Sequence, residues 1–222
     1  MKKASFIATL ALVLAVVGQS KADVYDLLTD WSDTDNPNGP WAYLEGNNPL
    51  PHVDSWQSQL GGWTMAQSGW ARSENGNNRL PFWFQSNGSE NFSPDWLAGD
   101  IIVHTHDDVN GVGNGLAAVT WTSPDGGTIT ISGAVWNGRN IGRGNDWRLY
   151  LNDQLLTSGH IESGDGHTRD QPFDLETGSG GADVLVDVPV AAGDLVRLEL
   201  QRTTQPGDFV GVNLTIELVQ IP

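Results

Sequence analysis

The sequence predicts an all-β protein, a single antiparallel β-sandwich of jelly-roll-like type with little helix outside the signal peptide. Three observations predict this fold. Apolar and polar residues alternate with a period of two in several segments, turn-forming residues separate these segments, and no stretch longer than a turn or two has helical periodicity. Many short strands with almost no helix are typical of two packed antiparallel sheets. No linker, charge block or internal repeat divides residues 23–222, so we expect one domain.

Residues 1–22 predict a secretory signal peptide. Lys2 and Lys3 precede the apolar run Phe6–Val17, and Ser20-Lys21-Ala22 offers small residues at the two positions that a signal peptidase reads. The apolar run is shorter than the roughly 20 residues that a membrane-spanning helix needs. We therefore expect a secreted protein, extracellular or periplasmic, that is not in the membrane after signal cleavage.

The charge balance excludes some classes of partner. Signal cleavage would remove all three lysines and no acidic residue, so the formal net charge would fall from −16 to −19, with only arginines opposing 27 acidic residues. Such a surface repels phosphate backbones and anionic lipids, so nucleic-acid and membrane-surface roles are not expected. It attracts cations such as Ca²⁺, although acidity also simply keeps a secreted protein soluble. The absence of cysteine excludes thiol catalysis, thiolate metal sites and disulfides.

Residues 23–95 predict a Trp-rich, irregular N-terminal part of the domain. Short strands are expected at Trp41–Leu44, Gly62–Ala66 and Leu80–Gln85. Val24–Trp31 fits a strand or a helical turn, and Asp35–Pro40 is rich in turn-forming residues.

Beyond Gly99 the alternation becomes regular, and half-buried strands are expected where it occurs. The segments are Asp100–His104, Thr128–Ser132, Trp147–Leu151, Val184–Val190, Val196–Gln201 and Val212–Leu218. Leu151–Gln154 is expected to join two of them as a hairpin. In this pattern Arg148 and Tyr150 lie on the polar face of their strand, as do Arg197, Glu199 and Gln201 on theirs.

Several of these strand and turn motifs together resemble a group of secreted bacterial proteins that often carry a PEP-CTERM sorting tail. The motifs are Leu97–His104, Ala118–Pro124, Gly127–Gly133, Val190–Asp194 and Asp208–Asn213, with Asp35–Gly39 near the start. The resemblance implies a β-sandwich similar to carbohydrate-binding jelly rolls and an exported location, but no particular activity. The chain ends at Leu218–Pro222 without the sorting motif, so membrane sorting by that route is not expected.

A histidine and aspartate cluster follows the first regular strand. If that strand continues, His104 and His106 project on the same side, and Asp107 and Asp108 begin the next loop. Two histidines and a carboxylate could bind Zn²⁺, whereas Asp107, Asp108 and loop carbonyls could bind Ca²⁺. Alternatively, the histidines only form hydrogen bonds with the loop backbone. No cofactor is required by the sequence.

Tryptophans are the first candidates for contacts with a ligand. An indole can stack on a sugar ring while polar neighbours bond the sugar hydroxyls. Trp63, Trp70 and Trp83 lie in a segment rich in asparagine and arginine, and we expect two or three exposed rings in this part of the chain. The alternative is that the tryptophans supply the core in a segment with few aliphatic residues.

A glycine-rich loop between two further tryptophans is the second candidate. Trp136, Arg139, Arg143 and Trp147 could clamp a carboxylate or a sugar through forked hydrogen bonds and stacking. Alternatively, the two arginines only neutralise nearby acids. The loop from His160 to Asp170 also contains histidines and carboxylates, and could approach the first cluster in space.

Motifs of catalysis are missing from the sequence. It contains no Gly-x-Ser-x-Gly, no His-Glu-x-x-His and no phosphate-binding glycine loop. We therefore expect a non-catalytic binding or surface-matrix module, with carbohydrate or extracellular matrix as partner and a cation as a stabiliser. The alternatives are a polysaccharide-active enzyme, either a lyase or a glycoside hydrolase using two of the many carboxylates, and a purely structural extracellular protein.

Overall fold

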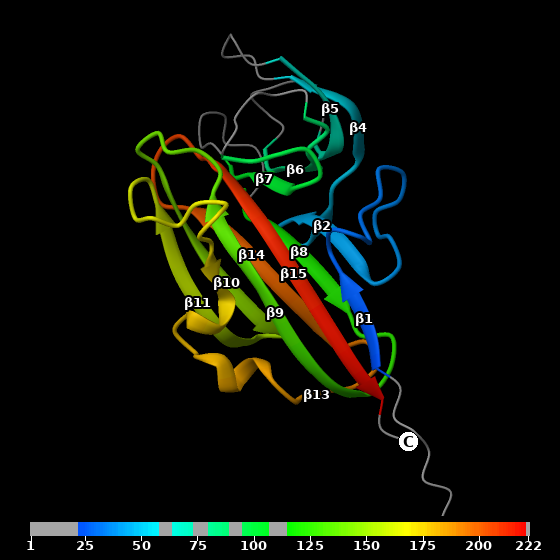
Figure 1. Ribbon diagram of the computed structural model, residues 1–222. Coiled ribbons are helices and arrows are strands. Elements are labelled where there is room, and N and C mark those ends of the chain that lie inside the picture. Colours follow the sequence, from blue (N-terminus) through cyan, green and yellow to red (C-terminus); the bar gives the residue numbers. More distant parts are fainter. Residues whose placement is uncertain (1–21, 58–63, 73–79, 89–94, 107–114, 221–222) are drawn as a thin grey trace, which may run out of the picture.

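The computed structural model describes residues 22–57, 64–72, 80–88, 95–106 and 115–220, and over these residues it confirms the predicted antiparallel β-sandwich (Figure 1). Helix within these residues is limited to two 3₁₀ turns, η3 (Leu175–Thr177) and η4 (Ala182–Leu185). No helix among them is long and apolar enough to cross a membrane. The predicted signal peptide lies outside the described residues except for Ala22.

The larger sheet has nine strands. They are β1 (Ala22–Asp26), β4 (His52–Gln57), β5 (Thr64–Ala71), β6 (Phe82–Gln85), β7 (Ile101–His104), β9 (Gly127–Asn137), β12 (Phe173–Asp174), β13 (Val188–Val190) and β15 (Phe209–Gln220). Their order is β12-β9-β15-β7-β6-β5-β4, with β1 also paired to β15 and β13 to β9. The long strand β15 therefore separates β9 from β7.

The smaller sheet has six strands in the order β11-β10-β14-β8-β2-β3. They are β2 (Trp41–Glu45), β3 (Asn48–Pro49), β8 (Ala117–Thr122), β10 (Gly144–Leu151), β11 (Gln154–Glu162) and β14 (Leu195–Arg202). The strands β10 and β11 form the predicted hairpin, in which Asn152 adopts a left-handed conformation with φ of 52°. This left-handed turn matches the twist of the strands it connects.

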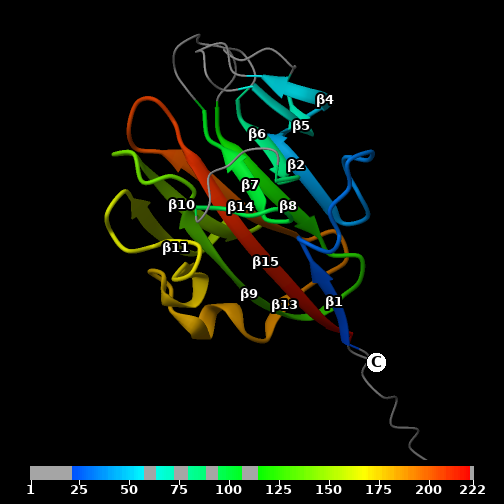
Figure 2. The same cartoon turned by 45° about the horizontal axis from the view of Figure 1, so that its top comes forward.

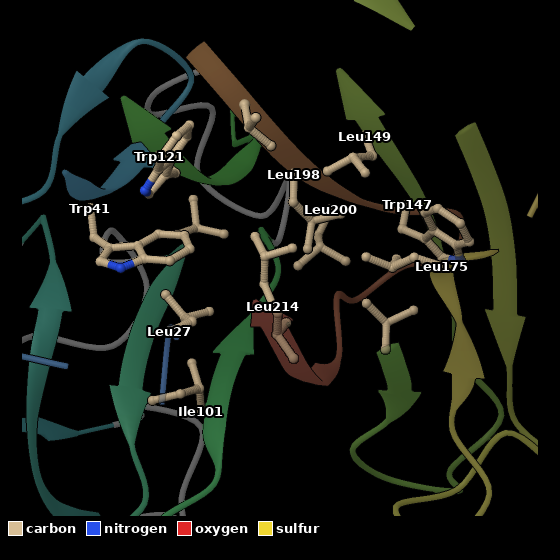
Figure 3. Packing of buried hydrophobic residues seen from close by; sticks show 14 of the residues in the cluster. Leu27, Trp41, Ile101, Trp121, Trp147, Leu149, Leu175, Leu198, Leu200 and Leu214 are labelled. Atoms are coloured by element: carbon tan, nitrogen blue, oxygen red, sulfur yellow. The ribbon is translucent and has the colours of Figure 1, made fainter. Parts of the chain in front are cut away.

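The sandwich interior contains apolar residues of both sheets (Figure 3). Trp41 and Trp121 are cross-strand neighbours in the smaller sheet, and Ile101 and Leu214 belong to the larger sheet. All four side chains are buried in the same apolar cluster. Burying a large apolar side chain stabilises a fold by about 1.5–3 kcal/mol, so this layer holds the two sheets together.

A second apolar cluster, here called the outer aromatic cluster, lies on the other side of the larger sheet. It consists of Val53, Trp56, Ala71, Leu80, Phe82, Phe84, Trp96, Ile102, Trp136 and Phe209. Phe82 and Phe84 flank Trp83, which points into the sandwich interior, so successive residues of β6 face opposite clusters. The rings of Trp56 and Phe82 are stacked with centroids 4.9 Å apart, and Trp96 lies 4.8 Å from Phe209.

The N-terminal part is more regular than expected. The strands β1, β2 and β6 pair with β15, β8 and β7, so residues from this part belong to both sheets. In both views β4, β5 and β6 lie at the end of the molecule opposite to the C-terminus (Figure 2). The Trp-rich segment therefore builds one end of the sandwich.

One predicted strand is partly wrong. Val184–Val190 alternates on paper, but residues 182–185 form η4 and only Val188–Val190 is a strand. Leu185 is the residue of η4 that enters the core, whereas Val186 is 50% exposed. Asp187 has a positive φ of 53°, which breaks the extended conformation that a continuous strand requires.

Candidate functional site

The tryptophans predicted to contact a ligand are buried wherever the structure describes them. Trp70, Trp83, Trp136 and Trp147 are at most 3% exposed, and Trp63 lies outside the described residues. Two or three exposed rings were expected in residues 23–95, but every described tryptophan there is buried except Trp31, which is partly exposed, so that expectation is corrected. In a segment poor in aliphatic residues, they supply the core instead.

Close packing explains how the loop tryptophans are enclosed. Trp147 lies against Gly159 and Gly178, where added Cβ atoms would come within 2.6 and 2.5 Å of the indole. Trp136 lies across Gly211, and its Nε1 donates to the backbone oxygen of Asp95 at 3.0 Å. The glycines make room for the rings, so neither ring can stack on a sugar in this structure.

The two histidines of the predicted metal site differ from the expected arrangement because β7 ends at His104. The His104 side chain is buried, its Nδ1 lies 2.6 Å from the backbone oxygen of Thr105, and its ring meets Phe209 edge-on with centroids 4.3 Å apart. This is the alternative in which a histidine bonds the loop backbone. Asp107 and Asp108 lie outside the described residues, among which no three His, Asp or Glu side chains form a metal-binding group.

The predicted arginine clamp faces a buried carboxylate. Arg143 donates from Nη1 to the backbone oxygen of Gly207 at 2.5 Å. Burial raises the pKa of Asp208 to about 7, although the Phe209 N–H and the charges of Arg143 and Arg139 act to lower it. Asp208 is fully enclosed. The arrangement therefore favours the alternative that these arginines neutralise an internal acid.

The loop from His160 to Asp170 does approach the start of the first regular strand. Arg169 forms a two-pronged ion pair with Asp100, with Nε and Nη2 at 2.6 and 3.0 Å from the carboxylate oxygens. His160 itself lies elsewhere, on the outer face of the smaller sheet, in contact with Asp146. This loop therefore links the two sheets, and among the described residues no metal-binding group includes its histidines.

A hollow of about 540 Å³ lies on the outer face of the smaller sheet. Its lining residues are Asn47, Tyr150, Asn152, Asp153, Leu195, Arg197 and Glu199. Tyr150 is paired with Arg197 across β10 and β14, and both alternate with residues buried in the core. The period of two thus directs the Tyr150 ring, Arg197 and Glu199 to the same face. We call this feature the Tyr150 hollow.

Arg197 and Glu199 form a fixed pair at the base of the hollow. Arg197 donates from Nε to Glu199 Oε1 at 2.6 Å and from Nη2 to the backbone oxygen of Gly46 at 2.6 Å. The two side chains are only 10% and 17% exposed. Because both ends of the guanidinium are held, the pair is pre-organised and loses little freedom when a ligand binds.

Three polar groups around this pair are available to a ligand. Within the described part of the chain, Tyr150, Asn47 and Asp153 form no side-chain hydrogen bond, and the Tyr150 ring is half-buried. Asn152 is engaged, since it bonds Asp194 and the Leu195 N–H and so fixes the hairpin. The hollow therefore presents an aromatic surface surrounded by unused donors and acceptors.

A row of interacting polar side chains continues from the hollow along β10 and its neighbours. This polar row consists of Asp146, Arg148, His160 and Gln201. Arg148 donates to Gln201 at 2.9 Å and to Asp146 at 3.2 Å, and His160 Nδ1 lies 2.9 Å from Asp146. Burial acts to lower the pKa of His160, but hydrogen bonds to Asp146 and Glu162 outweigh it, so the pKa is raised.

The sequence contained part of the signal for this site. Alternation placed Arg148 and Tyr150 on the polar side of one strand, and Arg197 and Glu199 on the polar side of another strand. The structure confirms that both pairs point away from the core. Alternation did not indicate that β10 and β14 are neighbours, because more than forty residues separate Tyr150 from its partner Arg197. Pairing between strands so far apart follows from the whole topology.

No family model and no characterised protein sequence matches this chain. Among solved structures, it is similar to a xylan-binding module CBM15, with 13% identity, 91% of this chain and 100% of that chain covered, and a TM-score of 0.35. It is also similar to the C-terminal CBM6 of the laminarinase LamC from Zobellia galactanivorans, with 11% identity, 79% and 98% coverage, and a TM-score of 0.28. At these scores neither similarity indicates what this chain binds.

Proposed function

We propose that this chain is a non-catalytic carbohydrate-binding module and that the Tyr150 hollow is its binding surface. One observation carries the proposal: a half-buried tyrosine ring, a fixed Arg197–Glu199 pair and the unpaired side chains of Asn47 and Asp153 line one hollow. A sugar ring has an apolar face of C–H groups and a rim of hydroxyls. An aromatic surface with polar groups at its edge complements both.

The size and fixation of the hollow support this assignment. A volume of about 540 Å³ is in the range of small-ligand sites, which extends from about 300 to 1,000 Å³. Apart from Asn47 in the β2–β3 turn, the polar groups of the hollow lie on paired strands and on a hairpin fixed by Asn152, so they need little rearrangement on binding. The polar row offers further hydrogen-bonding groups to a longer saccharide.

Binding is proposed in preference to catalysis because of where the perturbed carboxyl lies. A pKa of about 7, as for Asp208, is suited to a general acid. The Asp208 side chain is however fully enclosed and is packed at the end of the sandwich, away from the Tyr150 hollow, so it has no path to a saccharide.

The binding test compares Tyr150→Ala with the wild type by affinity electrophoresis and calorimetry against a panel of soluble polysaccharides. Loss of a central aromatic contact costs about 2 kcal/mol, so affinity should fall roughly 10- to 30-fold. Thr130→Ala is the matched control, because Thr130 lies on the outer face of the other sheet and its replacement should leave affinity unchanged. Binding that Tyr150→Ala does not weaken would place the site elsewhere.

Export and a stabilising cation belong to the same proposal. We propose that residues 1–22 direct secretion. N-terminal sequencing of the exported protein tests this, because it should locate the cleavage directly after Ala22. We also propose that Ca²⁺ or Zn²⁺ binds at His106, Asp107 and Asp108, without the enclosed His104. One equivalent of either ion added to the chelated protein should raise its melting temperature; no shift with both ions would contradict the cation site.

A further inference from the structure

The charges around the Tyr150 hollow narrow the class of carbohydrate that it can hold. This step rests on the proposed function, since it concerns the ligand of the same site. One cation, Arg197, and two carboxylates, Glu199 and Asp153, line the hollow. Arg197 already donates to Glu199 and to the Gly46 backbone, whereas Asp153 is exposed and has no partner among the described residues.

The other cations on this face are also matched by carboxylates. Arg148 lies 3.2 Å from Asp146, and His160 contacts both Asp146 and Glu162 at 2.9 and 3.6 Å. Asp194, which accepts a hydrogen bond from Asn152 beside the hollow, adds another negative charge. Every described cation near the hollow is therefore neutralised within the protein.

An acidic sugar would meet an unfavourable environment in this site. Its carboxylate would give up water and approach Asp153 and Glu199, while the nearest guanidinium is already bonded to another carboxylate and a carbonyl. The formal net charge of −16 adds a general repulsion. A neutral sugar has no such cost, because its hydroxyls can donate to Asp153 and can both donate to and accept from Asn47 and Tyr150.

We infer that the Tyr150 hollow selects neutral glycans and excludes uronic acids, with Asp153 and Glu199 as the excluding groups. Selectivity of this kind comes from an unfavourable contact with the wrong ligand as well as from favourable contacts with the right one. Asp153 lies on the exposed hairpin turn, so its charge can be removed with little effect on the fold.

The test uses methyl-esterified polygalacturonate against polygalacturonate, and a β-1,4-glucan against a β-1,4-polyglucuronate, so that the two members of each pair share a backbone and differ in the charge at C6. Binding constants are measured at low and high salt for the wild type, Asp153→Asn, Glu199→Gln and Asp183→Asn. Asp183 is an exposed acid of η4 that does not line the hollow, so its replacement gives the same change in net charge as a control.

The wild type should bind at least one neutral glycan ten-fold or more tightly than its acidic counterpart, with a smaller difference at high salt because salt screens the repulsion. Asp153→Asn should reduce the difference at least three-fold, and Asp183→Asn should not. Equal or tighter binding of a polyuronate would overturn the inference while leaving the proposed function intact. If Asp153→Asn and Asp183→Asn reduce the preference for the neutral glycan equally, Asp153 is not an excluding group. If the wild type binds no glycan at all, the proposed function itself is refuted.

Discussion

The outer faces of the two sheets follow the same period of two but are used differently. On the larger sheet the outward side chains near the β4–β6 end are aromatic, and Trp56 and Trp96 are packed with them in the outer aromatic cluster. On the smaller sheet, a hollow on the outer face is lined by Tyr150, Leu195 and charged or amide side chains. The outer face of the larger sheet is thus covered by side chains of the protein itself near this end, whereas the hollow on the smaller sheet is open to a ligand.

This difference shows that aromatic content alone does not identify a binding face. The Trp-rich segment has the composition of a sugar-binding surface, but its described rings close the end of the sandwich. The proposed site depends instead on a single tyrosine whose neighbours are polar. Four substitutions test this division of roles between the two faces, beginning with the one that has the largest expected effect.

Trp96→Ala should remove the covering of the larger sheet. The side chain is 1% exposed, and truncation of a buried tryptophan costs about 3–5 kcal/mol in the free energy of unfolding, measured by urea denaturation. The folded fraction should keep its affinity for glycan, because the Tyr150 hollow lies on the other sheet. A loss of stability below about 1 kcal/mol would show that Trp96 is not a structural cover, and the division between the faces would fail.

Arg197→Ala should affect both stability and binding. It leaves Glu199 without its partner in a mostly enclosed position, which costs about 3 kcal/mol, and it removes the base of the hollow. Arg148→Ala is the matched control on the same face, since its more exposed pair with Asp146 should contribute under about 1 kcal/mol. Similar losses from both variants in urea denaturation would contradict a special role for the Arg197–Glu199 pair.

Asp208→Asn should change how stability depends on pH. Burial raises the folded-state pKa of Asp208 from 3.8 to about 7, so ionising this group costs stability. The cost is absent below about pH 4, grows as pH rises, and is complete above about pH 7. Between pH 5 and 8 the wild type should therefore lose about 2 kcal/mol more than the variant. Parallel stability curves for the two proteins would refute the raised pKa.

His160→Ala should have the smallest effect. The pKa of His160 is raised in the folded state, so the stability that its protonation contributes is present at low pH and lost as pH rises through the raised value. The side chain is 44% exposed, and a pair so accessible to solvent contributes about 0.5 kcal/mol or less. The change in melting temperature between pH 5 and pH 8 should be slightly smaller for the variant than for the wild type. A large change would mean that the polar row is structural and not a surface for a ligand.

Much of the fold could be predicted because alternation depends only on near neighbours in the chain. The segments 128–132, 147–151, 196–201 and 212–218 all lie within strands of the structure. Val184–Val190 could not be distinguished from them, since its alternation gives no sign of the positive φ values of Gly181 and Asp187.

The site was less predictable because it combines residues far apart in the chain. Alternation assigned Tyr150 and Arg197 to outward faces, but their pairing and the position of Asn47 follow from the order of the whole sheet. The tryptophans were misjudged because a ring that stacks on a sugar and a ring that fills a core occur in similar sequences. Only the packing against glycines such as Gly159 and Gly211 separates the two cases.

The position of β15 has a consequence for how the chain folds. Residues 209–220 lie between β9 and β7 and also pair with β1, so the larger sheet has no continuous centre until this last strand is in place. Such long-range pairing makes folding slow, because the chain closes large loops before it gains their contacts. The larger sheet can therefore be completed only after residues 209–220 have been synthesised, because β1, β7 and β9 all pair with this one strand.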